Sequence, residues 1–209
     1  MIEELARKYI TEETRTLGVL PLAAVRRVME VLQDAYARKA QIFVMGNGGS
    51  AATASHLACD INKGLGVGRE KRFKMICLND NIPTMLAYAN DMSYSDVFVE
   101  QLRNFLRPHD VVIGISASGN SENVLKAIEF ADARGAVAVG VTGFDGGRLA
   151  QVARHSIVVP SRDMQVIEDV HLIICHMLFR LLEKTLATSQ VEASGRSLAA
   201  SRLAGPSDR

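Results

Sequence analysis

The chain has 209 residues, of which 48% are hydrophobic, which is enough for one domain with a sizeable core. Its 24 basic and 23 acidic residues leave a net charge of +1, so nothing in its charge favours binding to nucleic acid. It contains no run of about 18 apolar residues and no basic start followed by an apolar stretch, so we expect neither a membrane partner nor a secretory leader.

Two amphipathic segments open the chain, Met1 to about Leu17 and Pro21 to about Lys39. After them, short apolar runs alternate with helical patterns, which is typical of a parallel sheet. We predict strands at Gln41–Met45, Phe73–Leu78, Val111–Ile115, Ala136–Val141 and Ser156–Val159. We predict helices between them at Ser50–Ile61, Pro83–Asn90, Ser95–Phe105, Ser121–Ala133 and Gly147–Val152. The sequence therefore predicts an α/β/α sandwich with a five-stranded parallel sheet and extra amino-terminal helices.

A long final helix is predicted from about Met164 to Leu186, and it is apolar on much of its circumference. Together with the two amino-terminal helices it has more apolar surface than one small sheet can cover, so we expect a homo-oligomer. From Ser189 to Arg209 the apolar periodicity is lost and Ser, Ala and Gly dominate. We predict a single domain over residues 1–188 and a flexible tail over residues 189–209.

Cysteine usage bears on the compartment. Cys59, Cys77 and Cys175 are odd in number, and each lies within an apolar segment. Disulfides are rare in reducing compartments, and an odd set of buried thiols does not form a disulfide framework. We therefore expect a cytoplasmic protein.

Two glycine–serine turns, Met45–Ser50 and Ser116–Ser121, are the most informative motifs of the chain. Each follows a predicted strand and opens a predicted helix, where backbone N–H groups lack partners and the helix dipole is positive. Glycine lets an anion approach the backbone closely, and the serine hydroxyls add donors. Ligands of open parallel sheets bind beyond the carboxyl ends of the strands, so the two turns can share one pocket.

The composition of these turns indicates what they bind. Neither has the Lys-Ser/Thr pair of a nucleoside triphosphate loop or the spaced glycines of a dinucleotide loop. One such turn alone is as readily an ordinary connection with a serine N-cap, but two in one domain favour phosphate. We predict a phosphorylated small molecule and no organic cofactor. The residues expected at this site are Asn47, Gly48, Gly49, Ser50, Ser116, Ala117, Ser118 and Ser121.

Two histidines stand out as candidates for chemistry. His56 and Asp60 are four residues apart, so they project from one face of a helix. They are an acid/base pair, half of a metal site or, as this spacing alone favours, a plain ion pair. His176 lies in an apolar stretch and is either a core histidine with a polar neighbour or a functional acid, base or metal ligand. The same helix also carries Glu168, Asp169 and His171.

Taken in order along the chain, these motifs resemble the sugar isomerase (SIS) domain of phosphoheptose isomerases. The matching residues are Gly46–Ala52, His56, Ala89–Asp91, Gly114–Ser121, Val170, His171 and His176. The resemblance runs from about Met1 to Leu186 and implies a flavodoxin-like SIS fold and a homotetramer with active sites at subunit interfaces. It also implies interconversion of sedoheptulose 7-phosphate and D-glycero-D-manno-heptose 7-phosphate, on the route to lipopolysaccharide or capsule heptoses.

The resemblance also implies roles for single residues. An aldose–ketose isomerase moves a proton between adjacent carbons through an enediol. By resemblance Asp60 is the base and His176 its partner, with Glu168 as an alternative base that also binds substrate. Asp91 is expected to bind sugar hydroxyls. Many family members bind zinc with four residues, and the corresponding residues here are His56, Asp60, Glu168 and His176.

Two of these four residues depart from the family pattern, because Asp60 replaces a glutamate and Glu168 replaces a glutamine. A carboxylate withdrawn by about 1 Å can lose about a hundredfold in rate unless the second change compensates. Lys63 stands where the family usually carries an arginine-bearing stretch, and it could supply a positive charge near the phosphate. Two alternatives stay open: a non-catalytic phosphosugar-binding or protein-binding adaptor of the SIS family, and an isomerase of a different phosphosugar.

Overall fold

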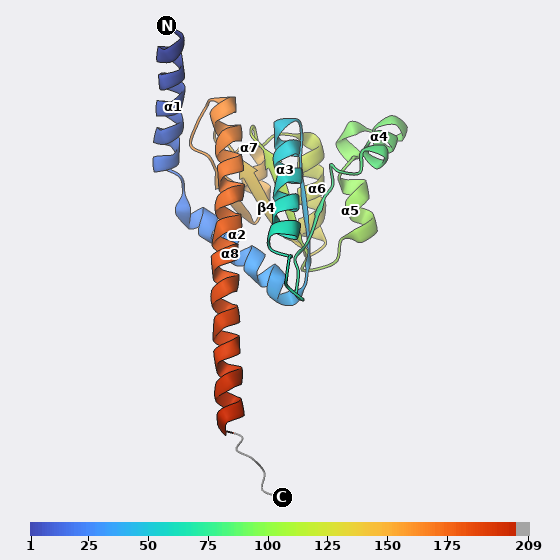
Figure 1. The fold of residues 1–209 in the computed structure, drawn as a ribbon. Helices are drawn as coiled ribbons and strands as arrows, with labels where there is room; N and C mark the ends of the chain where they lie inside the picture. Colours follow the sequence, from blue (N-terminus) through green and yellow to red (C-terminus); the bar gives the residue numbers. More distant parts are fainter. Residues whose placement is uncertain (204–209) are drawn as a thin grey trace, which may run out of the picture.

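A five-stranded parallel sheet forms the centre of the protein in a computed structural model that describes the backbone of residues 1–203 and the side chains of residues 1–187 (Figure 1). The sheet order is β2-β1-β3-β4-β5. The strands are β1 (Gln41–Gly46), β2 (Lys74–Cys77), β3 (Val111–Ser116), β4 (Val137–Thr142) and β5 (His155–Val158). Every residue of β3 is buried, as expected for an apolar strand covered on both faces. The predicted α/β/α sandwich is confirmed.

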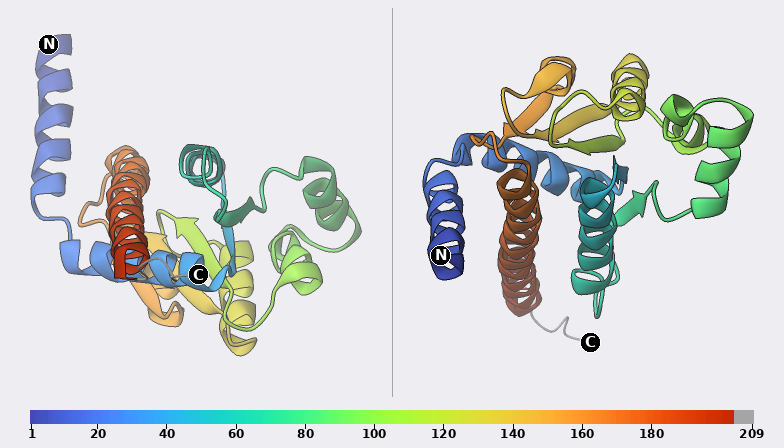
Figure 2. Two further views of the ribbon diagram at one scale, coloured as in Figure 1. Left: turned by 60° about the horizontal axis from the view of Figure 1, so that its bottom comes forward. Right: turned by 90° about the horizontal axis from the view of Figure 1, so that it is seen from above.

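Helices cover both faces of this sheet (Figure 2). The helices on one face are α2 (Leu22–Arg38), α3 (Gly49–Cys59) and α8 (Met164–Leu203). Those on the other face are α5 (Val99–Phe105), α6 (Glu122–Ala133) and α7 (Gly147–Val152). Beside this second layer lie α4 (Ile82–Asp91) and a short 3-10 turn, Tyr94–Asp96. The helix predicted over Ser95–Phe105 therefore begins only at Val99, because the hydroxyl of Ser93 accepts the N–H of Ser95 and caps the 3-10 turn.

Strand order reverses between β1 and β3, which lie side by side although β2 separates them in the chain. Open parallel sheets bind ligands at such a switch point, beyond the carboxyl ends of the strands. The two glycine–serine turns follow β1 and β3, so the topology brings them to the same place. The fold thus positions both turns at the expected ligand site.

The two terminal helices extend beyond the sheet. Helix α8 continues to Leu203, which corrects the end near Leu186 that the sequence predicted. Loss of apolar periodicity marked where the helix stops facing the core, whereas Ala and Glu in the following segment still favour helix. The last part of the predicted tail, residues 204–209, lies outside the described residues.

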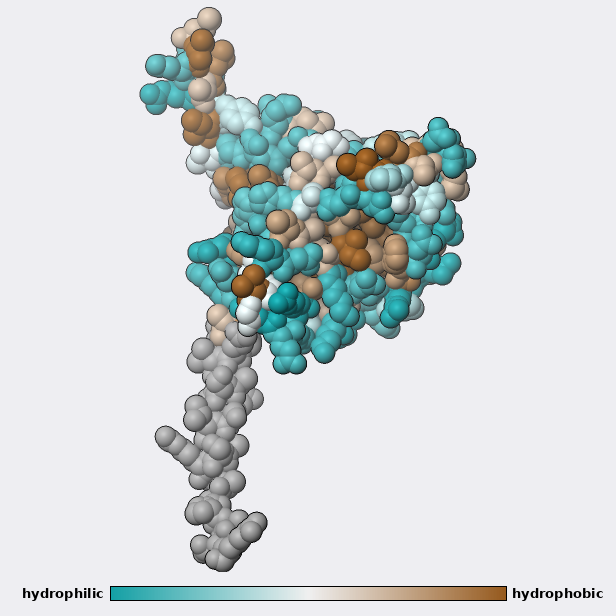
Figure 3. Space-filling model, turned by 45° about the vertical axis from the view of Figure 1, so that its right-hand side comes forward, coloured by the Kyte–Doolittle hydropathy of each residue, from teal (hydrophilic) through white to brown (hydrophobic). Residues whose placement is uncertain are grey.

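Helix α1 (Ile2–Gly18) packs on α8 near its carboxyl end and projects from the body at its amino end (Figures 1 and 3). Ile2, Leu5 and Ile10 are all more than half exposed on the projecting part. No helix of the described residues is long and apolar enough to cross a membrane.

Candidate active site

The two serine turns line one small cavity at the switch point. Its volume is about 140 Å³, below the roughly 300–1,000 Å³ of pockets for drug-sized ligands, so it suits a terminal group such as phosphate. Its lining residues are Asn47, Ser50, Ile115, Ser116, Ala117, Ser118, Ser121, Met164 and Glu168. The structure therefore brings all four predicted serines together around one space.

Local geometry explains why these turns have their composition. Gly48 has φ of 53°, a left-handed conformation that glycine adopts without strain, and it opens α3 at Gly49. In the second turn, the hydroxyls of Ser116 and Ser121 lie 3.0 Å apart and are hydrogen-bonded. Ser116 is buried, so its hydroxyl is held in place and faces the cavity from the end of β3.

Glu168 of α8 belongs to this cavity. Its carboxylate packs so closely against the first residue of α3 that a Cβ at Gly49 would collide with it. Gly49 therefore leaves room for the Glu168 carboxylate against the start of α3. A negative side chain thus lies beside the proposed phosphate site, near the positive end of the α3 dipole.

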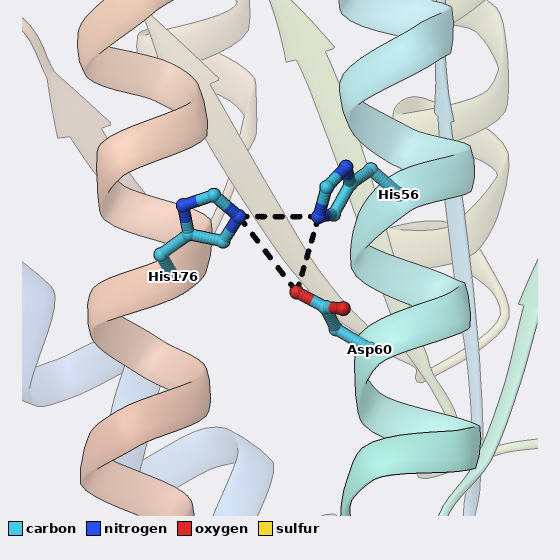
Figure 4. Close-up of side chains that lie close together, drawn as sticks. All are labelled: His56, Asp60 and His176. Atoms are coloured by element: carbon cyan, nitrogen blue, oxygen red, sulfur yellow. Dashed lines mark hydrogen bonds and ion pairs between the residues drawn. The ribbon is translucent and has the colours of Figure 1, made fainter.

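A second group of polar side chains, His56, Asp60 and His176, gathers where α3 and α8 pack together (Figure 4). The Nε2 atoms of the two histidines lie 3.1 Å apart. Asp60 Oδ2 is 3.2 Å from His56 Nε2 and 3.8 Å from His176 Nε2. The three side chains are between 32% and 48% exposed, so the group is open to a ligand. His176 is a member of a polar cluster and not a core histidine.

The shorter carboxylate of Asp60 still reaches both histidines. Asp60 begins a turn of π-helix, Asp60–Gly64, directly after α3. Such turns change the direction in which side chains leave a helix and are frequent at functional sites. Glu168 lies eight residues before His176, about 12 Å along α8, and is outside the group of three. Its place in a metal site therefore stays a prediction.

The other two polar residues that the sequence singled out on α8, His171 and Asp169, have structural partners. His171 is buried, and its Nε2 lies 3.0 Å from the carbonyl oxygen of Thr142, to which it donates. Burial lowers the pKa of His171, so it is neutral and ties α8 to the end of β4. Asp169 accepts a hydrogen bond of 2.5 Å from Tyr9 of α1, which raises the pKa of that tyrosine to about 12.

Two predicted site residues lie away from the serine cavity. Asp91, at the end of α4, accepts a hydrogen bond from the side chain of Asn90 and does not line the cavity. Lys63 lines a different cavity of about 620 Å³ between α3 and the edge strand β2. Within the described chain, neither contacts the serine turns, and the role of Asp91 stays a prediction.

Sequence reasoning missed Asn123 and Tyr94. Asn123 is 2% exposed in the first turn of α6, and its side chain is hydrogen-bonded to that of Asn47. The hydroxyl of Tyr94 donates to Asn47 Oδ1. The available signal for Asn123 was its place just after the second glycine–serine turn and before the apolar pair Val124-Leu125, since a buried amide there needs partners.

Comparisons with known proteins identify the family. Residues 8–143 match the SIS domain family. The phosphoheptose isomerase of Geotalea daltonii is 36% identical over 192 residues, which cover 89% of this chain and 97% of that protein. That of Paramagnetospirillum magneticum is 38% identical over 182 residues, covering 85% and 94%. The chain belongs to the phosphoheptose isomerase family of SIS domain proteins.

Solved structures agree with this assignment. A phosphoheptose isomerase from Francisella tularensis superposes with a TM-score of 0.80 at 25% identity, covering 88% of this chain and 96% of that chain. Phosphoheptose isomerase GmhA from Neisseria gonorrhoeae gives a TM-score of 0.81 at 26% identity, covering 88% and 100%. The family resemblance and the SIS fold expected from the motifs are confirmed.

Proposed function

We propose that this family member is an aldose–ketose isomerase that interconverts sedoheptulose 7-phosphate and D-glycero-D-manno-heptose 7-phosphate through an enediol. The observation that carries the proposal is the convergence of His56, Asp60 and His176 where α3 packs on α8, the two helices that also contribute residues to the serine cavity. An isomerase of this kind needs a base for carbon, help at the carbonyl and a grip on the phosphate. The three polar side chains would supply the base and the help at the carbonyl, and the serine cavity would hold the phosphate.

The separation of the two groups fits the length of the substrate. Glu168 marks the serine cavity and His176 marks the polar group, about 12 Å apart along α8. An extended chain advances about 1.2 Å per bond, so the eight bonds from C1 of an open heptose to its phosphorus span about 10 Å. A five-carbon chain is shorter by about 2.4 Å. The spacing therefore suits an extended phosphosugar, and the similarity to phosphoheptose isomerases supports a heptose over a pentose.

Asp60 and His176 are the proposed acid/base residues. With the phosphate held by Ser50, Ser116, Ser118 and Ser121, carbons 1 and 2 would lie against the polar group. Asp60 would take the proton from carbon, and His176 would move a proton at the neighbouring oxygen. The reach of Asp60 to both histidines supports an enzyme over a non-catalytic adaptor.

The same three side chains fit a zinc ion. Zinc at about 2.0–2.1 Å from tetrahedral nitrogen and oxygen ligands places those ligand atoms about 3.3 Å from one another. The separations of 3.1, 3.2 and 3.8 Å between the ligand atoms are close to this value. His56, Asp60 and His176 would hold the metal and leave a fourth position for substrate. When bound, zinc would polarise the carbonyl oxygen of the sugar.

We also propose a cytoplasmic homotetramer with active sites at subunit interfaces, feeding the synthesis of lipopolysaccharide or capsule heptoses. The exposed apolar side chains of α1 support association. All three cysteines are free, and burial raises the pKa of Cys77 and Cys175 to about 12, which suits a reducing compartment.

The test is NMR of the purified protein in heavy water with sedoheptulose 7-phosphate, first metal-free and then with added zinc. We expect an aldose product and deuterium on the carbon beside the carbonyl, with a faster rate after zinc is added. Saturable binding of the sugar phosphate without deuterium exchange would contradict the isomerase and favour a non-catalytic adaptor. Exchange with a hexose or pentose phosphate alone would change the substrate and leave the reaction class intact.

A further inference from the structure

The side-chain amides of Asn47 and Asn123 form a reciprocal pair between the two serine turns. Asn47 Nδ2 donates to Asn123 Oδ1 at 2.9 Å, and Asn123 Nδ2 donates to Asn47 Oδ1, also at 2.9 Å. Asn47 belongs to the turn after β1, and Asn123 follows the turn after β3. The pair is therefore a direct link between the two halves of the cavity.

Both amide oxygens in this pair are fully used. Asn47 Oδ1 also accepts the hydroxyl of Tyr94 at 2.9 Å, and Asn123 Oδ1 also accepts the backbone N–H of Val124 at 3.0 Å. A carbonyl oxygen has two lone pairs, so neither oxygen can accept a further bond. Rotating either amide by half a turn would place an NH₂ group against these donors. The network thus fixes the orientation of both side chains.

One group of this network is left for a ligand. Asn47 lines the serine cavity, whereas Asn123 is 2% exposed and does not. With its oxygen saturated, Asn47 can offer the cavity only the second N–H of Nδ2. A donor in that place suits an anionic or sugar oxygen and does not suit a hydroxyl that must donate.

We infer that Asn123 is a positioning residue that holds Asn47 as an N–H donor to a phosphate oxygen of the substrate. The inference rests on the proposed phosphosugar function for its ligand. Without Asn123, the oxygen of Asn47 regains a free lone pair and its amide can turn, so the cavity loses one fixed donor. Ground-state binding of phosphate should weaken, while the proton transfers at the distant polar group should not.

The test is calorimetric binding of inorganic phosphate and of sedoheptulose 7-phosphate to the full-length protein. We expect Asn123→Ala and Asn47→Ala each to weaken binding about tenfold, and the double variant to bind no worse than Asn47→Ala, because coupled residues are not additive. In turnover, KM should rise about tenfold with kcat within about twofold. Gln101→Ala is the control, since the buried amide of Gln101 on α5 donates to the carbonyl oxygens of Leu78 and Val97, away from the cavity.

Three results would overturn the inference: unchanged phosphate binding in Asn123→Ala, losses that multiply in the double variant, or an equal loss in Gln101→Ala. If Asn123→Ala does not fold, Asn123→Ser replaces it, because serine keeps an oxygen near Val124 but cannot span to Asn47. Binding is measured without turnover, so a wild-type protein that binds the phosphosugar but shows no exchange would refute the isomerase and leave this inference standing.

Discussion

The serine cavity and the histidine–aspartate group differ in their proposed roles and in the groups that form them. The cavity is built from turns locked by hydrogen bonds at strand ends, and its polar lining is mostly hydroxyl and amide. The other group consists of three half-exposed side chains on two helices. Binding thus depends on backbone conformation that local sequence sets, whereas chemistry depends on how α3 packs against α8. Variants of each region should therefore change different kinetic constants.

The largest effect is expected in the histidine–aspartate group. Asp60→Ala or His176→Ala should lower kcat at least a hundredfold, because each removes a proposed proton-transfer group. Phosphosugar affinity, measured by calorimetry, should change less than threefold. Arg180→Ala, which breaks an exposed ion pair with Glu183 one turn further along α8, is the matched control. Normal turnover in either variant would remove that residue from the mechanism.

Loss of a serine donor should act on binding instead. Ser116→Ala should weaken phosphosugar binding about tenfold or more, since a hydrogen bond to a charged group contributes about 1.5–3 kcal/mol. The rate at saturation should stay within about threefold of wild type. A loss confined to kcat would show that the serine cavity does not act through binding alone. Ser93→Ala, at the 3-10 turn outside the cavity, is the control for loss of a hydroxyl.

Glu168 is an exception to this separation of roles, since it is a carboxylate in the cavity where phosphate should bind. Glu168→Gln should tighten binding of inorganic phosphate about fivefold, because a like charge is removed from its surroundings. Stopped turnover in the same variant would identify Glu168 as the base in place of Asp60. Weaker phosphate binding would instead mean that the carboxylate organises the cavity. The exposed Glu183→Gln on the same helix is the control.

The last prediction concerns stability and not activity, at His171, which lies on α8 between the two regions. Burial lowers its folded pKa below the ordinary value of 6.5, so the unfolded chain binds the proton more readily. The free energy of unfolding should therefore fall as pH drops below about 6.5, by up to about 1.4 kcal/mol per pH unit for one group. Burial and two arginines shift His155 in the same direction.

Urea unfolding at pH 7.5 and pH 5.5 measures this dependence. His171→Asn should be less stable at pH 7.5 but lose less on acidification than the wild type. An unchanged pH slope would show that His171 does not contribute to it. His155→Gln measures how much of the pH dependence comes from His155 and how much from His171.

Much of the architecture was predictable from short-range pattern. Apolar runs such as Val111–Ile115 indicate strands buried on both faces, and the glycine–serine turns indicate where a strand ends and a helix begins. The end of α8 was not predictable, because apolar periodicity reports contact with a core, whereas the helix itself continues to Leu203 after that periodicity is lost. The four serines were found from sequence for the same reason that the strands were: each belongs to a local motif.

By itself, then, the sequence determined the sheet, the two turns, the chemical types of the site residues and the family. Only the tertiary structure decided that Asp60 reaches His176, that Glu168 lies with the serines instead, and that Asn123 fixes Asn47. Each of these depends on the distance between side chains on different elements. Periodicity and turn composition encode how each segment buries itself, but they do not encode which residues of two packed segments come to lie opposite one another.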